Sequence, residues 1–163
     1  MADENHIHHY FAPRVGWIEL QVSEKGVRSI AYISPPESPK TSRSNFIVDQ
    51  LVKELDEYFG GKRKTFSLPL DPADGTPFQR QVWERLTEIP FGETRSYAQV
   101  AAATGNPRAA RAVGSANKRN QIPILIPCHR VVHADGSLGG YNSGTHIKKA
   151  LLELEGVSLS AEN

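Results

Sequence analysis

Residues 96–118 read SYAQVAAATGNPRAARAVGSANK and predict two short helices joined by a tight turn. Ser96 is a suitable N-cap for a helix over residues 97–104, because its hydroxyl can accept a hydrogen bond from a free backbone N–H of the first turn. The GNP sequence at residues 105–107 predicts the turn, and a proline at the first helical position favours a second helix from 108 to about 118. This pattern indicates a helix-turn-helix, although αα-hairpins without any role in DNA binding share it.

The second of these helices combines basic side chains with very small ones. Ala109, Ala110, Gly114 and Ser115 leave the backbone open to close approach. A glycine inside a helix costs about 1 kcal/mol relative to alanine, which close packing against the core or a ligand would explain. From Thr94 to Ala134 the chain has no acidic residue, whereas its basic residues there are Arg95, Arg108, Arg111, Lys118, Arg119 and Arg130. A solvated surface normally mixes both signs, so this stretch indicates a polyanionic partner, with chance clustering as the alternative.

The flanking segments complete a mainly helical C-terminal half. Thr76 or Pro77 begins a helix with apolar residues on one face, and a last helix is expected over residues 145–155, ended by Gly156. Between them lies an apolar, β-branched run at residues 122–132 that two prolines interrupt.

The N-terminal half predicts strands followed by a helix. Strand-forming residues occupy 15–22 and 27–33, and the sequence SEKG between them is a plausible hairpin turn in which Gly26 supplies a positive φ. Apolar residues at helical spacing then run from Asn45 to Phe59. The sequence DPADGTP at residues 71–77 is the most evident linker, so we expect two domains, residues 1–74 and 75–163.

Composition limits the possible classes of protein. The chain has 163 residues with a formal net charge of +1, and no apolar run approaches the roughly 20 residues of a membrane span. The polar N-terminus lacks the features of a signal peptide, and a single cysteine cannot form an internal disulfide. We therefore expect a cytoplasmic protein, or a nuclear one in a eukaryote. Nothing resembles a structural zinc site, and we interpret His6, His8 and His9 as part of a frayed terminus, with weak metal binding as the alternative.

The only cysteine, Cys128, has an unusual context. A lone cysteine is usually an inert buried side chain, but here His129 and Arg130 follow directly. A thiolate is the nucleophilic form, and cationic or hydrogen-bonding neighbours lower the free thiol pKa of about 8.5. His129 can act as the base, directly or through a water, if another group orients it. Glu155 is the candidate, because the last helix could return its carboxylate to the imidazole.

The sequence around Cys128 resembles a known family. The segment IPILIPCHRVV at residues 122–132 contains Pro-Cys-His-Arg-Val, which is similar to the active-site signature of the O6-alkylguanine-DNA alkyltransferases. Residues 75–120 resemble the DNA-binding half of that family, and DGSLGGYNSG with KKALLELEG resemble its C-terminal part. The likeness covers about residues 75–157. Earlier residues match loosely through GWIELQV at 16–22, where the family has a ribonuclease H-like α/β domain before its winged helix-turn-helix domain.

The resemblance implies a role for each matching residue. Cys128 would accept the alkyl group, His129 would deprotonate it through a water, and Glu155 would hold His129. Asn120 would hold the turn beside the site, Tyr97 would protonate the guanine at N3 and crowd a phosphate, and Arg111 would fill the space left by the extruded base. The helix around it would contact DNA through Arg108, Ala110, Gly114 and Ser115, together with Arg95. The substrate pocket would be formed by Tyr141, Val131, Pro123 and the loop from Gly139 to Gly144, in which Asn142 replaces a serine common in the family.

The resulting expectation is direct, single-turnover repair of O6-alkylguanine, and of O4-alkylthymine as an additional substrate to be tested. The partner would be double-stranded DNA bound through the minor groove, with no cofactor, no metal and a monomeric protein. Two alternatives come from other classes. One is a non-catalytic protein that recognises DNA lesions, and its family relatives lack the cysteine. The other is a Cys-His hydrolase, which would need an oxyanion hole and has no use for a basic helix without acidic residues.

Overall fold

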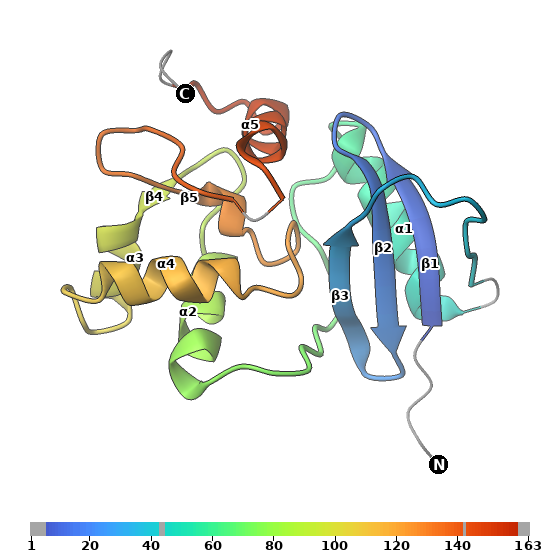
Figure 1. Ribbon diagram of the computed structural model, residues 1–163, viewed down its shortest axis with the longest axis horizontal. Helices are drawn as coiled ribbons and strands as arrows, with labels where there is room; N and C mark the ends of the chain where they lie inside the picture. Colours follow the sequence, from blue (N-terminus) through green and yellow to red (C-terminus); the bar gives the residue numbers. More distant parts are fainter. Residues whose placement is uncertain (1–5, 43–44, 142, 160–163) are drawn as a thin grey trace. The chain divides into compact units, whose positions relative to one another are not determined.

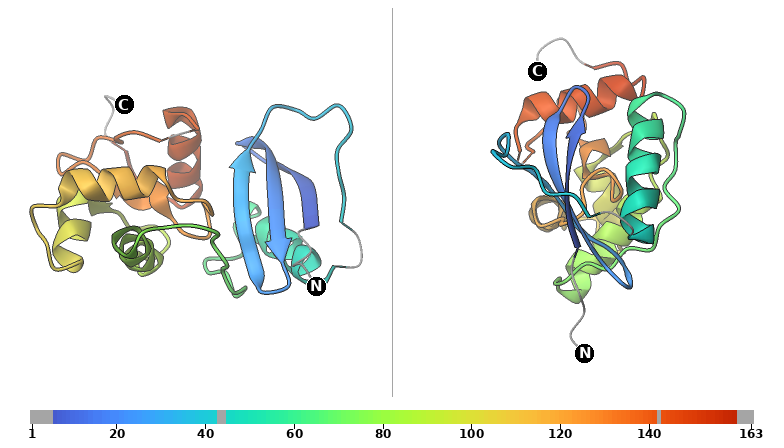
Figure 2. Two further views of the ribbon diagram at one scale, coloured as in Figure 1. Left: turned by 60° about the horizontal axis from the view of Figure 1, so that its bottom comes forward. Right: turned by 90° about the vertical axis from the view of Figure 1, so that its right-hand side faces the viewer.

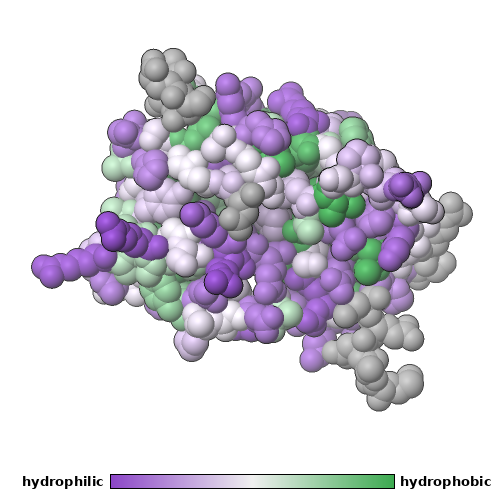
Figure 3. Space-filling view, in the orientation of Figure 1, coloured by the Kyte–Doolittle hydropathy of each residue, from purple (hydrophilic) through white to green (hydrophobic). Residues whose placement is uncertain are grey.

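The computed structural model describes residues 6–42, 45–141 and 143–159. The chain divides into two compact units, Met1–Ala73 and Asp74–Asn163. No helix in the described part of the chain is both long and apolar enough to cross a membrane. On the face drawn in Figure 3, hydrophobic residues are scattered among hydrophilic ones rather than gathered in a single patch.

The first unit is a three-stranded antiparallel sheet with one helix against it (Figures 1 and 2). The strands β1 (His6–Ala12), β2 (Gly16–Ser23) and β3 (Gly26–Tyr32) lie in chain order. On β2 every second side chain, from Ile18 through Leu20 to Val22, is fully buried, as expected for one face of a strand that packs on a core. The two predicted strands therefore form within one residue of the expected positions.

Helix α1 (Phe46–Phe59) covers this face of the sheet. Asn45 caps it by accepting from the backbone N–H of Val48 at 2.9 Å, which confirms the helix expected from residue 45. Its buried apolar side chains follow helical spacing: Val48, Leu51, Leu55, Tyr58 and Phe59. This core between one sheet and one helix is the α/β arrangement predicted from the sequence.

The hairpin between β2 and β3 needs its glycine. Gly26 has φ +149°, and a Cβ there would lie 2.2 Å from the carbonyl oxygen of Pro69. The same carbonyl accepts from the N–H of Val27 at 2.9 Å, and Asp71 N–H returns a bond to the Val27 carbonyl at 2.8 Å. The close approach of residues 69–71 therefore excludes any side chain at position 26.

The interpretation of His6, His8 and His9 as a frayed terminus is wrong, because all three belong to β1. Backbone N–H groups of Lys40 and Ser42 donate to the Nδ1 atoms of His9 and His8, at 2.9 and 3.2 Å. The histidines thus act as hydrogen-bond acceptors for a loop distant in sequence, which hydrophobic periodicity cannot reveal. Among the described residues, no group of three or more His, Cys, Asp or Glu side chains could hold a metal ion.

The second unit is mainly helical. Its helices are α2 (Pro77–Thr87), α3 (Tyr97–Ala103), α4 (Ala110–Lys118) and α5 (Thr145–Leu154), with the 3-10 turn η1 (Cys128–Arg130) and a short parallel pair, β4 (Arg95–Ser96) and β5 (Val131–Val132). Thr76 and Ser96 each cap a helix in a reciprocal capping box. This confirms the cap predicted at Ser96 and the helix start predicted at Thr76 or Pro77. Helices α3 and α4 form the expected helix-turn-helix, seen at the left of Figure 1.

Helix α4 begins at Ala110, two residues later than predicted. The side-chain oxygen of Asn106 accepts from the N–H of Arg108 at 3.3 Å, and Ala109 N–H donates to the Asn106 carbonyl at 3.0 Å. These bonds extend the turn through Pro107 and Arg108, since an asparagine side chain competes with the helix for backbone N–H groups. Arg108 therefore lies in the turn before α4, where it is exposed.

Candidate active site

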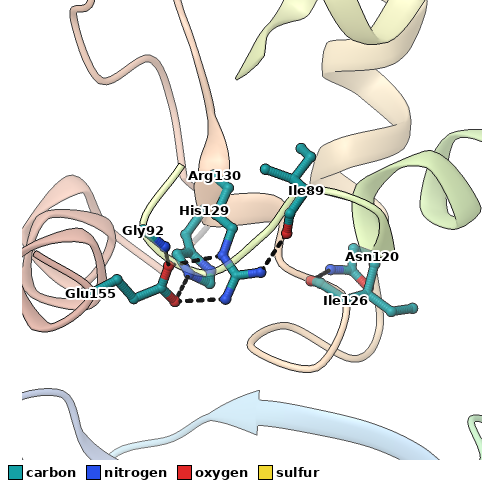
Figure 4. A network of polar contacts seen from close by, with 7 residues as sticks. All are labelled: Ile89, Gly92, Asn120, Ile126, His129, Arg130 and Glu155. Atoms are coloured by element: carbon teal, nitrogen blue, oxygen red, sulfur yellow. Dashed lines mark hydrogen bonds and ion pairs between the residues drawn. The ribbon is translucent and has the colours of Figure 1, made fainter. Parts of the chain in front are cut away.

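The segment that carries Cys128 is a buried loop rather than a strand. Pro123 and Pro127 lack the N–H groups that a central strand needs, and Ile124 has φ +76°. Asn120 holds the loop from both sides: its Nδ2 donates to the Ile126 carbonyl at 2.8 Å, and its Oδ1 accepts from Ile122 N–H at 3.0 Å. Figure 4 shows the contact with Ile126. The loop ends at Cys128, which is the first residue of η1.

Cys128 is almost fully buried, with 4% of its surface exposed. Burial raises the pKa of its thiol, while hydrogen bonds with the Asn120 and Tyr141 side chains and the charge of Lys148 partly oppose that rise. The net direction is opposite to the expectation drawn from the neighbouring His129 and Arg130. The thiol is therefore the stable form in the resting site, and a nucleophilic thiolate requires a base.

His129 is fully buried and bound to Glu155. Its Nε2 lies 2.7 Å from Oε2 of the carboxylate. Figure 4 marks this contact with a dashed line. Burial would raise the pKa of Glu155, but its hydrogen bonds with His129 and Arg130 outweigh this effect and hold the pKa far below its usual range. The carboxylate is thus ionised and can only accept, so Nε2 carries the proton and Nδ1 has a free lone pair. That Nδ1 is buried and has no hydrogen-bond partner among the described residues.

Arg130 completes the network on the other side of the carboxylate. Its Nε donates to Oε1 of Glu155 at 2.8 Å and one terminal nitrogen donates to Oε2 at 3.0 Å, while the other donates to the Ile89 carbonyl at 2.7 Å (Figure 4). The guanidinium is buried, so it is not available to a DNA phosphate as its place in the acid-free stretch had suggested. Its function here is to hold Glu155.

Lys148 is the cation beside the thiol, and sequence reasoning missed it. Its side chain is fully buried, and Nζ donates to the Val131 carbonyl at 2.6 Å. Burial lowers the pKa of Lys148 to about 8, against the attraction of Cys128, which raises it. A lysine is usually a surface residue, so the only available signal was that Lys148 lies on the same face of α5 as the buried Ile147 and Leu151.

Tyr97, at the first turn of α3, is half-buried near the same group of residues. Its ring lies 5.3 Å from the ring of His133 and 6.0 Å from Nζ of Lys148. Burial raises the pKa of its hydroxyl, and the charge of Cys128 adds to this, so the hydroxyl keeps its proton. Gly139, with φ +75°, comes so near that a Cβ would lie 2.7 Å from the Tyr97 hydroxyl oxygen. Only glycine can approach this closely.

A cavity of about 480 Å³ lies between α4 and the Tyr97 ring. Its lining residues are Tyr97, Ala110, Arg111, Gly114, Ser115, Asn117, Lys118, His133 and Gly140. Five of these were predicted as site residues from the sequence, and Gly140 belongs to the loop at residues 139–144 that was expected to wall the pocket. Asn117, Lys118 and His133 were not predicted there. A Cβ on Gly114 would stay 3.8 Å from the Tyr97 ring, an ordinary contact, so packing within the protein does not itself require glycine there.

The other predicted residues are placed differently. Arg95 is apart from this cavity: it donates to the Thr94 carbonyl and to Glu93, and it lines a separate hollow with Arg85 and Gln99. Pro123 and Val131 are buried. Tyr141 is half-buried and hydrogen-bonds the thiol. Asn142 lies outside the described residues, so the prediction made for it remains a prediction.

Comparison with known proteins assigns both units to one family. Residues 7–72 match the ribonuclease-like domain of 6-O-methylguanine DNA methyltransferase, and residues 77–157 match the DNA-binding domain. A methylated-DNA–protein-cysteine methyltransferase from Methanosarcina acetivorans is 44% identical over 152 residues, 90% of this chain and 96% of that protein. The chain belongs to the 6-O-methylguanine DNA methyltransferase family.

Two further members of the 6-O-methylguanine DNA methyltransferase family are similar to this chain. The constitutive methyltransferase of Bacillus subtilis is 58% identical over 107 residues, which cover 65% of this chain and 64%, less than two thirds, of that protein. The crystal structure of Mycobacterium tuberculosis OGT in complex with DNA has a TM-score of 0.80 and 39% identity, with 92% of each chain covered. The expected order of a ribonuclease-like α/β domain followed by a helical DNA-binding domain is thereby confirmed.

Proposed function

We propose that this protein repairs O6-methylguanine in DNA by transferring the methyl group irreversibly to Cys128. One observation carries the proposal, and it concerns the surroundings of the only cysteine. The Cys128 carbonyl accepts a hydrogen bond from Nδ2 of Asn117 in α4 at 3.1 Å, and the next residue, His129, is paired with the buried Glu155. A nucleophile, a base and a basic helix of small residues are thus combined within one unit. Family membership supports the same reaction.

His129 is proposed to take the thiol proton on Nδ1, directly or through a water. Burial lowers the pKa of His129, so the imidazole is neutral near pH 7 and its lone pair is available. As the proton leaves, the Glu155 carboxylate stabilises the resulting imidazolium through Nε2. Lys148 stabilises the thiolate by its charge.

The thiolate then attacks the methyl carbon in line with the bond that breaks. The Sγ–C bond forms, the bond between the carbon and O6 breaks, and its electron pair goes to the guanine. Tyr97 is proposed to supply a proton at N3, which its raised pKa permits because the hydroxyl remains protonated. The product is a thioether that no thiol exchange reverses, so each molecule acts once.

The chemistry requires the damaged nucleotide to leave the base stack, at a cost of a few kcal/mol. The α4 face is suited to the minor groove, because Ala110, Gly114 and Ser115 let the backbone approach closely. Arg111 is exposed at the cavity and is proposed to enter the gap in the duplex. Binding of this kind reads no sequence, as repair of lesions at any site requires. We propose that the protein acts as a monomer.

The test of this function is a mass measurement. Incubating the protein with duplex DNA that contains O6-methylguanine should add the mass of one methyl group to the peptide that bears Cys128. Undamaged DNA of the same sequence is the control and should add nothing. Unchanged mass after exposure to damaged DNA would exclude the proposed function.

An Arg111→Ala variant should repair duplex DNA about 10-fold to 100-fold more slowly. Without the arginine side chain in the gap of the duplex, the free energy of the state with an extruded nucleotide should rise by about 1–3 kcal/mol. Its reaction with the free alkylated base should change little. The matched control is Arg119→Ala, an exposed arginine just after α4 that does not line the cavity. Single-turnover rates on both substrates check the prediction, and equal losses on duplex and free base would remove the proposed role of Arg111.

A further inference from the structure

His133 lies beside Tyr97 because of the short parallel strand pair in the second unit. Strands β4 and β5 pair in register, with Ser96 opposite Val132. Tyr97 and His133 directly follow these paired residues, which places their rings side by side. The ring centroids are 5.3 Å apart, and both side chains line the cavity next to α4. The strand pairing therefore places an imidazole next to the proposed proton donor.

The polar atoms of the two rings lie near the same point of the backbone. A Cβ on Gly139 would be 2.7 Å from the Tyr97 hydroxyl oxygen and 3.4 Å from Nε2 of His133. The His133 backbone is held in a turn, where its N–H donates to the Ser137 carbonyl at 2.9 Å. His133 is exposed, whereas Tyr97 is half-buried. An imidazole that contacts both solvent and the cavity can carry a proton from one to the other.

The charges around His133 have both signs. Asp135, in the same turn, attracts the protonated ring. Arg111 and Lys118 of α4 also line the cavity, and Nζ of Lys148 on α5 lies 6.0 Å from the centroid of the tyrosine ring. The carboxylate attracts the imidazolium and the three cations repel it. His133 can therefore take up a proton from water and release it in the cavity.

We infer that His133 acts through Tyr97, by returning a proton to its hydroxyl oxygen as that hydroxyl protonates N3 of the extruded guanine. The inference rests on the proposed function and adds a residue that supports the proton donor. The O–H bond of Tyr97 breaks as the N3–H bond forms. An N–H bond of the imidazolium then breaks as the O–H bond is restored, directly or through a water. His133 ends as a neutral imidazole, and the guanine leaves without a negative charge.

Without this second proton, Tyr97 would be left as a phenolate. Burial and the charge of Cys128 raise the pKa of the Tyr97 hydroxyl, so a phenolate is unfavourable in this site. A neighbouring proton donor lowers that cost, because negative charge does not accumulate on the tyrosine oxygen. The contribution of His133 should be present at low pH, where histidine is protonated, and absent at high pH, where histidine is neutral.

The test compares the wild-type protein with His133→Gln, whose side chain is polar but cannot give up a proton. Single-turnover methyl transfer is measured at saturating DNA from duplexes with O6-methylguanine or with its 3-deaza analogue, in which a C–H group replaces N3. On O6-methylguanine the variant should be about 10-fold slower at pH 6, and the difference should vanish toward pH 9. On the 3-deaza analogue, which accepts no proton at that position, the two proteins should react at the same rate.

His146→Gln is the matched control, because His146 is an exposed histidine on α5 that does not line the cavity. It should leave both rates unchanged. In a Tyr97→Phe background, His133→Gln should have no further effect, since no hydroxyl remains to receive a proton.

An unchanged rate of His133→Gln on O6-methylguanine at pH 6 would overturn the inference. A loss of equal size on the two duplexes, or one that persists in Tyr97→Phe, would also overturn it and would make His133 a DNA contact only. A wild-type protein that transfers no methyl group from O6-methylguanine would instead overturn the proposed function.

Discussion

A Cys128→Ala variant should show no methyl transfer at all from O6-methylguanine in DNA, while its affinity for DNA stays within about 3-fold of wild type. The complete loss is expected because the chain has no second cysteine that could accept the methyl group. DNA affinity should persist because the proposed contact surface is the α4 face, and Cys128 is 4% exposed. Mass spectrometry measures the first quantity and fluorescence anisotropy with a labelled duplex the second.

The control for this variant is its stability. Replacing a buried thiol by a methyl group leaves a small void and should lower the free energy of unfolding by about 1 kcal/mol. Loss of DNA binding together with transfer in a variant that is still folded would mean that Cys128 has a structural role in the DNA-binding surface. Residual methyl transfer would mean that another residue accepts the group.

Glu155→Gln should both destabilise the protein and slow methyl transfer. The carboxylate is fully buried and accepts from His129 and Arg130, so its neutralisation leaves the buried Arg130 guanidinium without its counter-charge. Breaking a buried ion pair by changing one partner costs about 3–5 kcal/mol. The His129 imidazolium also loses its stabilising anion, and we expect transfer to slow by about 100-fold in the variant under conditions that keep it folded. Urea unfolding and single-turnover rates measure the two effects.

Glu153→Gln provides the matched control, since Glu153 lies on the same helix α5 with a half-exposed side chain 3.9 Å from Lys149. Exposed ion pairs contribute at most about 1 kcal/mol, so this change should be nearly silent in both assays. Comparable destabilisation by the two substitutions would contradict the role given to the buried network.

The free energy of unfolding, measured as a function of pH, shows whether ionised Glu155 stabilises the folded protein. The pKa of Glu155 is depressed in the folded protein, chiefly because hydrogen bonds with His129 and Arg130 outweigh its burial. Its stabilisation is therefore fully present above the ordinary glutamate pKa of about 4.3 and is lost as pH falls toward the depressed value. Wild-type stability should drop across this acidic range, and the drop should be smaller in Glu155→Gln.

Local features of the sequence determined most of the secondary structure. The cap at Ser96, the turn glycines and the helical spacing of apolar residues each involve only a few neighbouring positions, so they can be recognised in the sequence alone. Strand β1 was missed because its histidines are not apolar and owe their place to the loop at residues 40–42. The start of α4 was misplaced because the Asn106 side chain competes for a backbone N–H.

The sequence also indicated the proposed nucleophile and its proposed base, because Cys128 and His129 are adjacent in a motif that resembles the family signature. Tertiary structure alone decided how the charges are distributed around them. Arg130 turns to Glu155, and Lys148 on α5 is the cation beside the thiol. Sequence adjacency does not determine the direction of a side chain, and burial, which sets the pKa of each group, arises only when distant segments exclude water together.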